Sequence, residues 1–294
     1  MCCRLLPILI ALISLQSNSL ANETGEGSRF TFLPGRILVH PFVANYQEPR
    51  VGLRKEAGTS HLKIDIGSTL DLLEYTISTE KSKKLRAGVD FFTYALSTSA
   101  EGRRLQIDAV DGLFGGHLSY QAMDDVAAFS LRLRIIHSSA HFIDGHFDNA
   151  TGTWKDGIAP IPFTRDFVEV IGAYERKWPG ISLMAYSGFS YAMLIRPENI
   201  KRASTIHGFE AHTTDVWGTA LGKPFSLFVA TNLALVGIPT YIGTSNLEFG
   251  VKFGEWSGTG VRLYLSYYSG LNVFSQYYNI RENNWGLGFT FDAW

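Results

Sequence analysis

The residues with the clearest potential for chemistry are His137, Ser139 and His141, which lie at alternate positions of one short segment. In an extended strand, residues two apart project from the same face with Cα atoms about 7 Å apart, so the imidazole of His137 can approach the hydroxyl of Ser139. A histidine in that position can act as a general base that activates a serine nucleophile. One hypothesis for this segment is therefore an acyl-transfer site. The other is a set of solvated polar side chains at the end of a strand.

The element that carries these side chains is predicted to be a strand over residues 126–142. Its odd positions carry Phe129, Leu131, Leu133 and Ile135 before His137, Ser139 and His141, whereas its even positions carry Arg132, Arg134 and Ser138. Strict alternation of this kind indicates a half-buried strand. The two histidines and Ser139 therefore continue the apolar face toward the end of the strand, while the arginines point to the other side.

The same alternation recurs along most of the chain. It predicts strands near residues 49–56, 60–77, 84–97, 105–120, 126–142, 163–176, 181–195, 204–216, 224–236, 242–255, 260–269 and 284–293. The connections at 143–162 and 270–283 are the longest, and the turn at 177–180 is short. In a barrel with both termini in the periplasm, the two long connections fall outside and the short turn inside, as in bacterial outer-membrane barrels.

Composition narrows the class of protein. The chain has 294 residues, a net charge of −1 and 46% hydrophobic residues. This apolar content excludes a disordered chain, and the lack of a basic excess predicts no nucleic-acid partner. Apart from residues 5–15 there is no long apolar run, whereas a membrane-spanning helix needs about 20 apolar residues. A soluble β-protein and a membrane β-barrel remain, because a barrel distributes its lipid-facing residues over many short strands.

The polar face of the strands favours the barrel. It carries interleaved acids and bases, namely Lys63, Asp65, Arg86, Asp90, Arg132, Arg134, Glu169, Glu210, Glu248, Lys252 and Arg262. Paired charges inside a narrow lumen explain this mixture, which a face in bulk water would not require. We therefore predict an all-β, antiparallel up-and-down transmembrane β-barrel of about twelve strands, with ten to fourteen possible. A soluble β-protein is the alternative.

The N-terminus predicts export. Arg4, the apolar stretch Leu5 to Leu15 and the small-residue site Ser19-Leu20-Ala21 form a signal-peptide pattern over residues 1–21. Both cysteines, Cys2 and Cys3, fall within it, so the mature chain has none. Residues 22–48 are interpreted as a periplasmic leader or plug segment, and residues 49–294 as the barrel. The expected location is the bacterial outer membrane.

Three segments resemble an uncharacterised bacterial family, the domain-of-unknown-function 1207 family. They are the sequences PFVANYQEPR at 41–50, LRLRIIHSSAH at 131–141 and YYSGLNVFSQYY at 267–278. The resemblance implies an envelope protein with the character of an outer-membrane barrel. The family has no established activity, so the resemblance adds location and fold rather than function.

The spacing of His137 and Ser139 is similar to the His-x-Ser motif of outer-membrane phospholipase A and of lipid A deacylase. That similarity implies that His137 is the base and Ser139 the nucleophile that attacks an acyl ester. Asn149 and Asp166 are the candidates for the group that orients the histidine, and calcium is implied only under this alternative. The phospholipase continues with Asn-Gly after the serine, whereas Ala140-His141 follows here. The other interpretation is that His137, Ser139 and His141 are polar residues solvated by lipid headgroups.

Two further clusters have simple interpretations. Asp144, His146, Asp148, Asn149 and Asp156 offer oxygen ligands for calcium, but their spacing matches no fixed template and a solvated outer loop is favoured. Arg132, Arg134 and Glu169 are expected to form an ion network in the lumen. The sequence thus predicts an outer-membrane barrel with a structural, binding or narrow-transport role, no cofactor, and membrane lipids or lipopolysaccharide as partners. An outer-membrane acyl hydrolase is the alternative.

Overall fold

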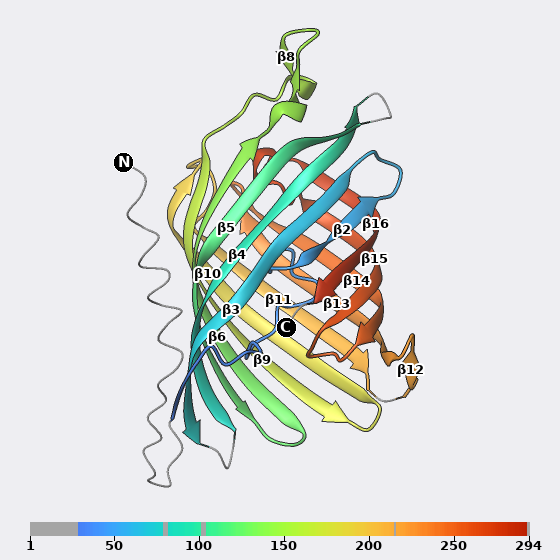
Figure 1. Cartoon of the computed structure of the whole chain (residues 1–294). Helices are drawn as coiled ribbons and strands as arrows, with labels where there is room; N and C mark the ends of the chain where they lie inside the picture. Colours follow the sequence, from blue (N-terminus) through green and yellow to red (C-terminus); the bar gives the residue numbers. More distant parts are fainter. Residues whose placement is uncertain (1–28, 79–81, 101–103, 215, 293–294) are drawn as a thin grey trace, which may run out of the picture.

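The computed structural model describes residues 29–78, 82–100, 104–214 and 216–292, and most of their strands form one antiparallel sheet that closes on itself (Figure 1). Of its fourteen strands, β1 (Phe30–Phe32) and β12 (Thr219–Ala220) are short, which leaves twelve in the barrel wall. The wall consists of β2 (Val51–Glu56), β3 (Leu62–Ser78), β4 (Lys83–Ala100), β5 (Arg104–Met123), β6 (Ala127–Phe142), β9 (Phe163–Trp178), β10 (Ile181–Arg196), β11 (Ala203–Thr213), β13 (Lys223–Gly237), β14 (Tyr241–Gly254), β15 (Gly260–Leu271) and β16 (Arg281–Asp292). Within the described part of the chain, no helix is long and apolar enough to cross a membrane.

The predicted all-β, antiparallel barrel of twelve strands is confirmed. The wall closes because β3 pairs with β4 on one edge and with β2 on the other, and β2 in turn pairs with β16. The strand ends differ by a few residues from the sequence pattern. For example, β5 continues to Met123 and β11 stops at Thr213, because backbone pairing continues or ends independently of side-chain alternation.

The two faces of the wall are divided as the alternation predicts. Side chains that point outward are apolar and exposed, such as Leu265 at 44% and Leu287 at 64%. All eleven charged residues assigned to the polar face are buried inside the barrel, including Arg134 at 0% and Lys252 at 1%. A soluble β-protein has the reverse distribution, since its apolar faces pack against each other. The exterior of this barrel therefore fits an apolar medium rather than water.

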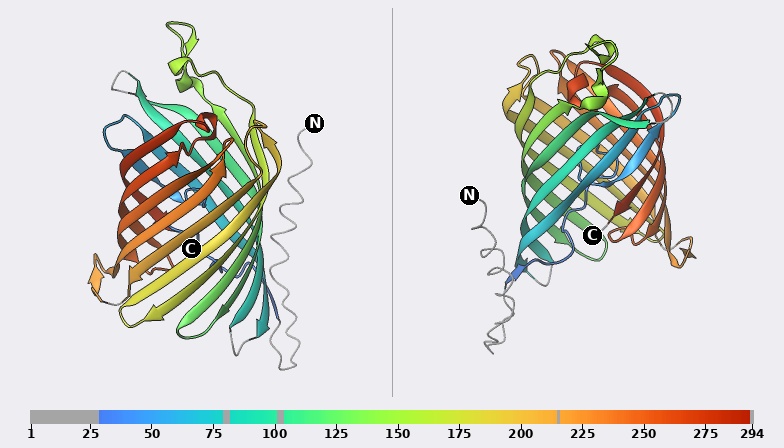
Figure 2. Two further views of the ribbon diagram at one scale, coloured as in Figure 1. Left: turned by 180° about the vertical axis from the view of Figure 1, so that it is seen from behind. Right: turned by 45° about the horizontal axis from the view of Figure 1, so that its top comes forward.

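The two ends of the barrel differ. One end, here called the loop end, carries the connection at 143–162, which contains η2 (Asp144–His146), β7 (Phe147–Asp148), β8 (Thr153–Trp154) and η3 (Lys155–Gly157). It also carries η4 (Ser275–Tyr277), between β15 and β16. The opposite end, here called the turn end, has short turns at 124–126 and 179–180, and β16 runs toward it (Figure 2).

The first strand of the wall is interrupted. β1 pairs with residues 73–75 of β3, and β2 pairs with residues 62–65 on the same edge of β3. Eighteen residues, 33–50, connect β1 to β2, although only seven residues of β3, 66–72, separate the two pairings. The connecting chain therefore leaves the sheet after β1 and rejoins it at β2.

The excursion runs through the interior of the barrel (Figure 1). Ile37, Leu38, Phe42, Val43 and Ala44 are at most 7% exposed, and Asn45, Glu48 and Arg50 are equally buried. We call residues Ile37 to Arg50 the lumenal segment. It includes most of the described part of the region that the sequence offers as a leader or plug, together with Pro49 and Arg50. The expected signal peptide, residues 1–21, lies outside the described residues.

Candidate functional site

A buried ion cluster holds the lumenal segment at its centre. The carboxylate of Glu48 accepts a hydrogen bond from Nη1 of Arg132 at 3.0 Å and lies 3.5 Å from Nη1 of Arg134. Arg134 also donates through Nε to Oε1 of Glu169 at 2.8 Å. Charges removed from water are tolerated when they are paired and hydrogen-bonded, as these are. The predicted network of Arg132, Arg134 and Glu169 is therefore present, and Glu48 joins it to the lumenal segment.

Backbone groups of the lumenal segment are bonded to the wall along its length. The amide of Leu38 donates to Asp71 at 2.7 Å, and the amide of Val43 donates to Glu210 at 2.6 Å. Asn246 donates to the carbonyl of Ala44 at 2.8 Å. Non-repetitive backbone inside a protein needs such partners for its N–H and C=O groups. The wall side chains thus replace the hydrogen bonds that a strand or water would supply.

Aromatic packing adds to these bonds. The ring of Phe42 stacks on Tyr186 of β10 with centroids 4.1 Å apart and an interplanar angle of 22°. The guanidinium of Arg132 lies 5.0 Å from the centre of the Phe42 ring. Stacked pairs are worth about 0.5–1.5 kcal/mol beyond the area they bury. The lumenal segment is therefore a packed part of the barrel interior, not a loose tether.

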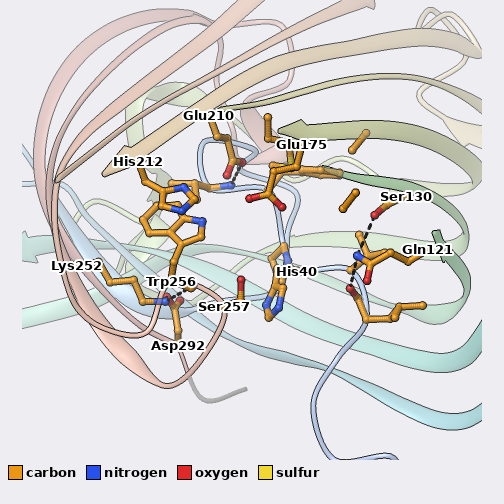
Figure 3. Close-up of a pocket in the computed structure, with 18 of the residues that line it drawn as sticks. His40, Gln121, Ser130, Glu175, Glu210, His212, Lys252, Trp256, Ser257 and Asp292 are labelled. Carbon is orange, nitrogen blue, oxygen red and sulfur yellow. Dashed lines mark hydrogen bonds and ion pairs between the residues drawn. The ribbon is translucent and has the colours of Figure 1, made fainter. Parts of the chain in front are cut away.

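A cavity of about 80 Å³ remains between the lumenal segment and the turn end (Figure 3). His212 and Trp256 stack on one side of it, with ring centroids 4.1 Å apart. Lys252 on the same side donates to Asp292 at 2.7 Å. His40 of the lumenal segment points into the cavity, and its Nδ1 has no hydrogen-bond partner among the described residues. The cavity can hold a few water molecules or a small polar solute.

The loop end is covered by its own connections. His146 is fully buried; its Nδ1 lies 3.0 Å from a carboxylate oxygen of Asp108, and its Nε2 donates to the carbonyl of Ile158 at 2.7 Å. The hydroxyl of Tyr277 in η4 donates to the other oxygen of Asp108. These bonds join η2, η4 and β5. His146, which the sequence offered as a calcium ligand, is thus part of a buried hydrogen-bond cluster.

The outward-facing segment of β6 lies near the loop end. His137, Ser139 and His141 point outward, and Nδ1 of His137 lies 2.6 Å from Oδ1 of Asp166 on β9. Both side chains of this pair are partly exposed, at 38% and 39%. The described contacts contain no hydrogen bond between His137 and Ser139. His137 and Asp166 thus form a pair on the outer surface, and Ser139 lies on the same strand face as His137.

The two candidates for the group that orients His137 lie in different places. Asn149 lies in the turn between β7 and β8, and Asp166 takes the position beside His137. Asp148, the last residue of β7, accepts a hydrogen bond from the backbone amide of Ala150 at 2.8 Å. Among the described residues, no group of three or more His, Cys, Asp or Glu side chains has the geometry to hold a metal ion.

Sequence reasoning missed a second outward polar pair. Ser187 on β10 and His207 on β11 are register partners, and Ser187 Oγ lies 3.0 Å from His207 Nδ1. The pairing of β10 with β9 places Ser187 beside Gly172. Gly172 lies six residues after Asp166 on β9, closer to the turn end. Phe189 and Phe209 next to it are 50% and 40% exposed, so this pair lies within the apolar belt. The alternation along each strand predicts that both side chains point outward, but it does not predict that they contact each other.

No family model matches the sequence, and no curated protein matches it either. Among solved structures, the chain is similar to the β domain of the Bordetella autotransporter Brka, with 11% identity, a TM-score of 0.47, and 82% of this chain and 96% of that chain covered. It is also similar to OmpT with loop L8 deleted, an outer-membrane protein of Vibrio cholerae, with 12% identity, a TM-score of 0.38 and coverage of 82% and 96%.

Proposed function

We propose that this chain is a bacterial outer-membrane β-barrel whose lumen is closed at rest by its own N-terminal segment. It would be exported by a cleaved signal peptide at residues 1–21 and would contact membrane lipids or lipopolysaccharide through its exterior. The observation that carries the proposal is the ion cluster of Glu48 with Arg132 and Arg134 inside an apolar-coated barrel. Its role is binding or gated narrow transport rather than open diffusion.

The membrane location is supported by the inverted distribution of side chains. Apolar residues such as Phe289 at 41% and Leu263 at 46% exposure cover the exterior, and charges line the interior. Only closed barrels and helices satisfy all backbone groups in a bilayer. Fractionation should recover the protein with the outer membrane, and the band should migrate faster on a gel before heating than after. A soluble, heat-insensitive product would contradict this location.

Closure is tested by conductance in planar bilayers. We expect wild type to be silent or to open rarely. Glu48→Gln removes the charge that faces the two arginines and should raise the frequency of opening at least tenfold. The matched control is Glu198→Gln, which changes an exposed ion pair with Arg196 at the loop end. A large steady conductance of wild type would contradict the closed lumen, and equal behaviour of the two variants would contradict the role of Glu48.

A second candidate function, an outer-membrane acyl hydrolase, is favoured by one contact. Asp166 lies 2.6 Å from Nδ1 of His137, so the imidazole can present Nε2 toward an incoming hydroxyl. Ser139 on the same face is the nucleophile of this candidate, with phospholipid or lipid A as the acyl ester. For catalysis, the Ser139 side chain must come within hydrogen-bond distance of His137. Catalytic hydrogen bonds are often longer in the absence of substrate and shorten when substrate binds.

The hydrolase is tested by release of fatty acid from detergent-dispersed phospholipid and lipid A, with and without calcium. Ser139→Ala should abolish release. Ser187→Ala is the matched control, because it removes an outward serine that also contacts a histidine but lies deeper in the apolar belt. Equal rates for wild type and Ser139→Ala would contradict the hydrolase without affecting the proposal of a closed barrel.

A further inference from the structure

Arg165 differs from the other arginines inside the barrel. Arg50, Arg54, Arg86, Arg132, Arg134 and Arg262 each lie within 4.0 Å of a carboxylate oxygen. No such ion pair is found for Arg165 in the described part of the chain. Its Nη2 lies 3.5 Å from the amide oxygen of Gln47, and its guanidinium lies 4.1 Å from the centre of the Phe167 ring.

An unpaired guanidinium inside a protein is costly unless an anion compensates it. Two buried acids lie near Arg165, and other groups engage both of them. Glu169 on the same strand accepts a hydrogen bond from Nε of Arg134 at 2.8 Å. Asp111 is fully buried, and its two oxygens accept the backbone amide of Ser275 at 3.1 Å each, with the hydroxyl of Tyr94 at 3.4 Å. Arg165 therefore keeps its positive charge available for a ligand.

The side chain of Arg165 lines a cavity of about 60 Å³ at the loop end. The cavity lies between the lumenal segment, represented by Tyr46 and Gln47, and the connection that contains Ser275. Its remaining wall includes the apolar residues Ile200, Val236, Ile238 and Val273. At about 15 Å³ for each water-sized position, the space holds about four such positions. The ligand is therefore small, with one anionic end and an apolar remainder.

We propose that this cavity binds a short-chain carboxylate, with its carboxylate group on Arg165 and its alkyl chain against Val236 and Ile238. A guanidinium matches a carboxylate through two parallel N–H donors. The apolar wall favours an alkyl carboxylate over inorganic phosphate, which would need hydrogen bonds on all sides. The lumenal segment forms one wall of this cavity, so the site rests on the seated segment of the proposed function. Propionate binding and conductance are measured separately, so failure of one proposal is distinguishable from failure of the other.

The test is a calorimetric titration of the full-length protein in detergent with propionate. Wild type should bind in a saturable manner at one site. Propionamide, which has the same shape without charge, should bind at least tenfold more weakly. Arg165→Met, which keeps an unbranched side chain without the charge, should weaken propionate binding at least tenfold, and Arg165→Lys should lie between. Inorganic phosphate should bind more weakly than propionate.

The proposal is overturned if wild type shows no saturable propionate binding, if propionamide binds equally well, or if phosphate binds more tightly. It is also overturned if folded Arg165→Met retains wild-type affinity. That variant should keep the heat-modifiable gel mobility of wild type, because it removes a charge without leaving a carboxylate unpaired. If it fails to fold, the comparison of propionate with propionamide on wild type decides the proposal by itself.

Discussion

Oε2 of Glu48 lies 3.0 Å from Nη1 of Arg132 in the middle of the barrel, although 84 positions separate the two residues in the sequence. This contact makes the N-terminal segment and the wall one structural unit. The charges on the wall are thus part of the binding surface for that segment. A substitution in the segment or in these wall residues should therefore change the stability of both.

Arg134→Met should destabilise the folded barrel strongly. Arg134 is fully buried between Glu48 and Glu169, and its removal leaves Glu169 with only Arg132, 3.9 Å away, as a counter-charge. Breaking a buried ion pair from one side costs about 3–5 kcal/mol. Urea-induced unfolding in lipid vesicles, followed by tryptophan fluorescence, measures the change. Arg281→Met, which alters an exposed arginine at the start of β16, should leave the midpoint unchanged. Equal midpoints for the two variants would show that the pair contributes little.

A charge on the outer face of the wall should impair folding into membranes. Leu265 on β15 is 44% exposed within the apolar belt. An arginine there should cost about 2–4 kcal/mol if the position lies near the bilayer midplane. Leu265→Arg should therefore reduce the folded fraction in vesicles, whereas Thr240→Arg in the exposed turn between β13 and β14 should not. An unaffected folded fraction for Leu265→Arg would argue that this face does not contact lipid.

His61 at the loop end should make a small, pH-dependent contribution to stability. Its Nδ1 lies 3.2 Å from Oε2 of Glu56, and this hydrogen bond raises the pKa of His61 above 6.5. The folded state therefore favours the protonated imidazole. The stability gained is fully present below about pH 6.5 and is lost as the pH rises through the raised pKa.

Comparison of wild type with His61→Gln between pH 5 and pH 9 measures this contribution. The difference in unfolding midpoint between the two should be largest at the acidic end and should shrink with increasing pH. A difference that grows with pH would have the wrong sign for a histidine stabilised by a carboxylate.

Asp166→Asn should reduce any acyl hydrolysis that depends on Ser139. The amide can still hydrogen-bond to His137, but it no longer favours the tautomer and charge that the base needs, and such a change costs up to about 10⁴-fold in a serine triad. The rate of fatty-acid release, with His207→Gln as a control on the deeper pair, measures the effect. A rate equal to wild type would remove Asp166 from the mechanism.

Local periodicity accounts for what the sequence predicted correctly. Each strand has period two, so Leu131 and Leu133 could be assigned outward and Arg132 and Arg134 inward without coordinates. The number of strands followed from counting such segments. The position of a strand end, as at Thr213 of β11, depends on whether a neighbour continues to pair, which one strand does not encode.

Contacts between distant segments could not be predicted in the same way. Glu48 lies in a segment without any periodicity, so nothing in the sequence pairs it with Arg132. Asp166 was one of two candidates beside His137, and only the register of β6 with β9 selects it over Asn149. The absence of an ion pair for Arg165 in the described residues likewise depends on which side chains meet in three dimensions.

The interrupted first strand limits the order in which the barrel can assemble. β2 is the last link of the wall, since it joins β3 to β16, and its pairing with β16 connects residues 230 positions apart (286 − 56). Pairings of such long range form late, because their loop-closure entropy is large. Residues 33–50 precede β2 directly, so they must already lie on the inner side when that last pairing forms. We therefore expect insertion of the N-terminal segment to accompany barrel closure rather than to follow it.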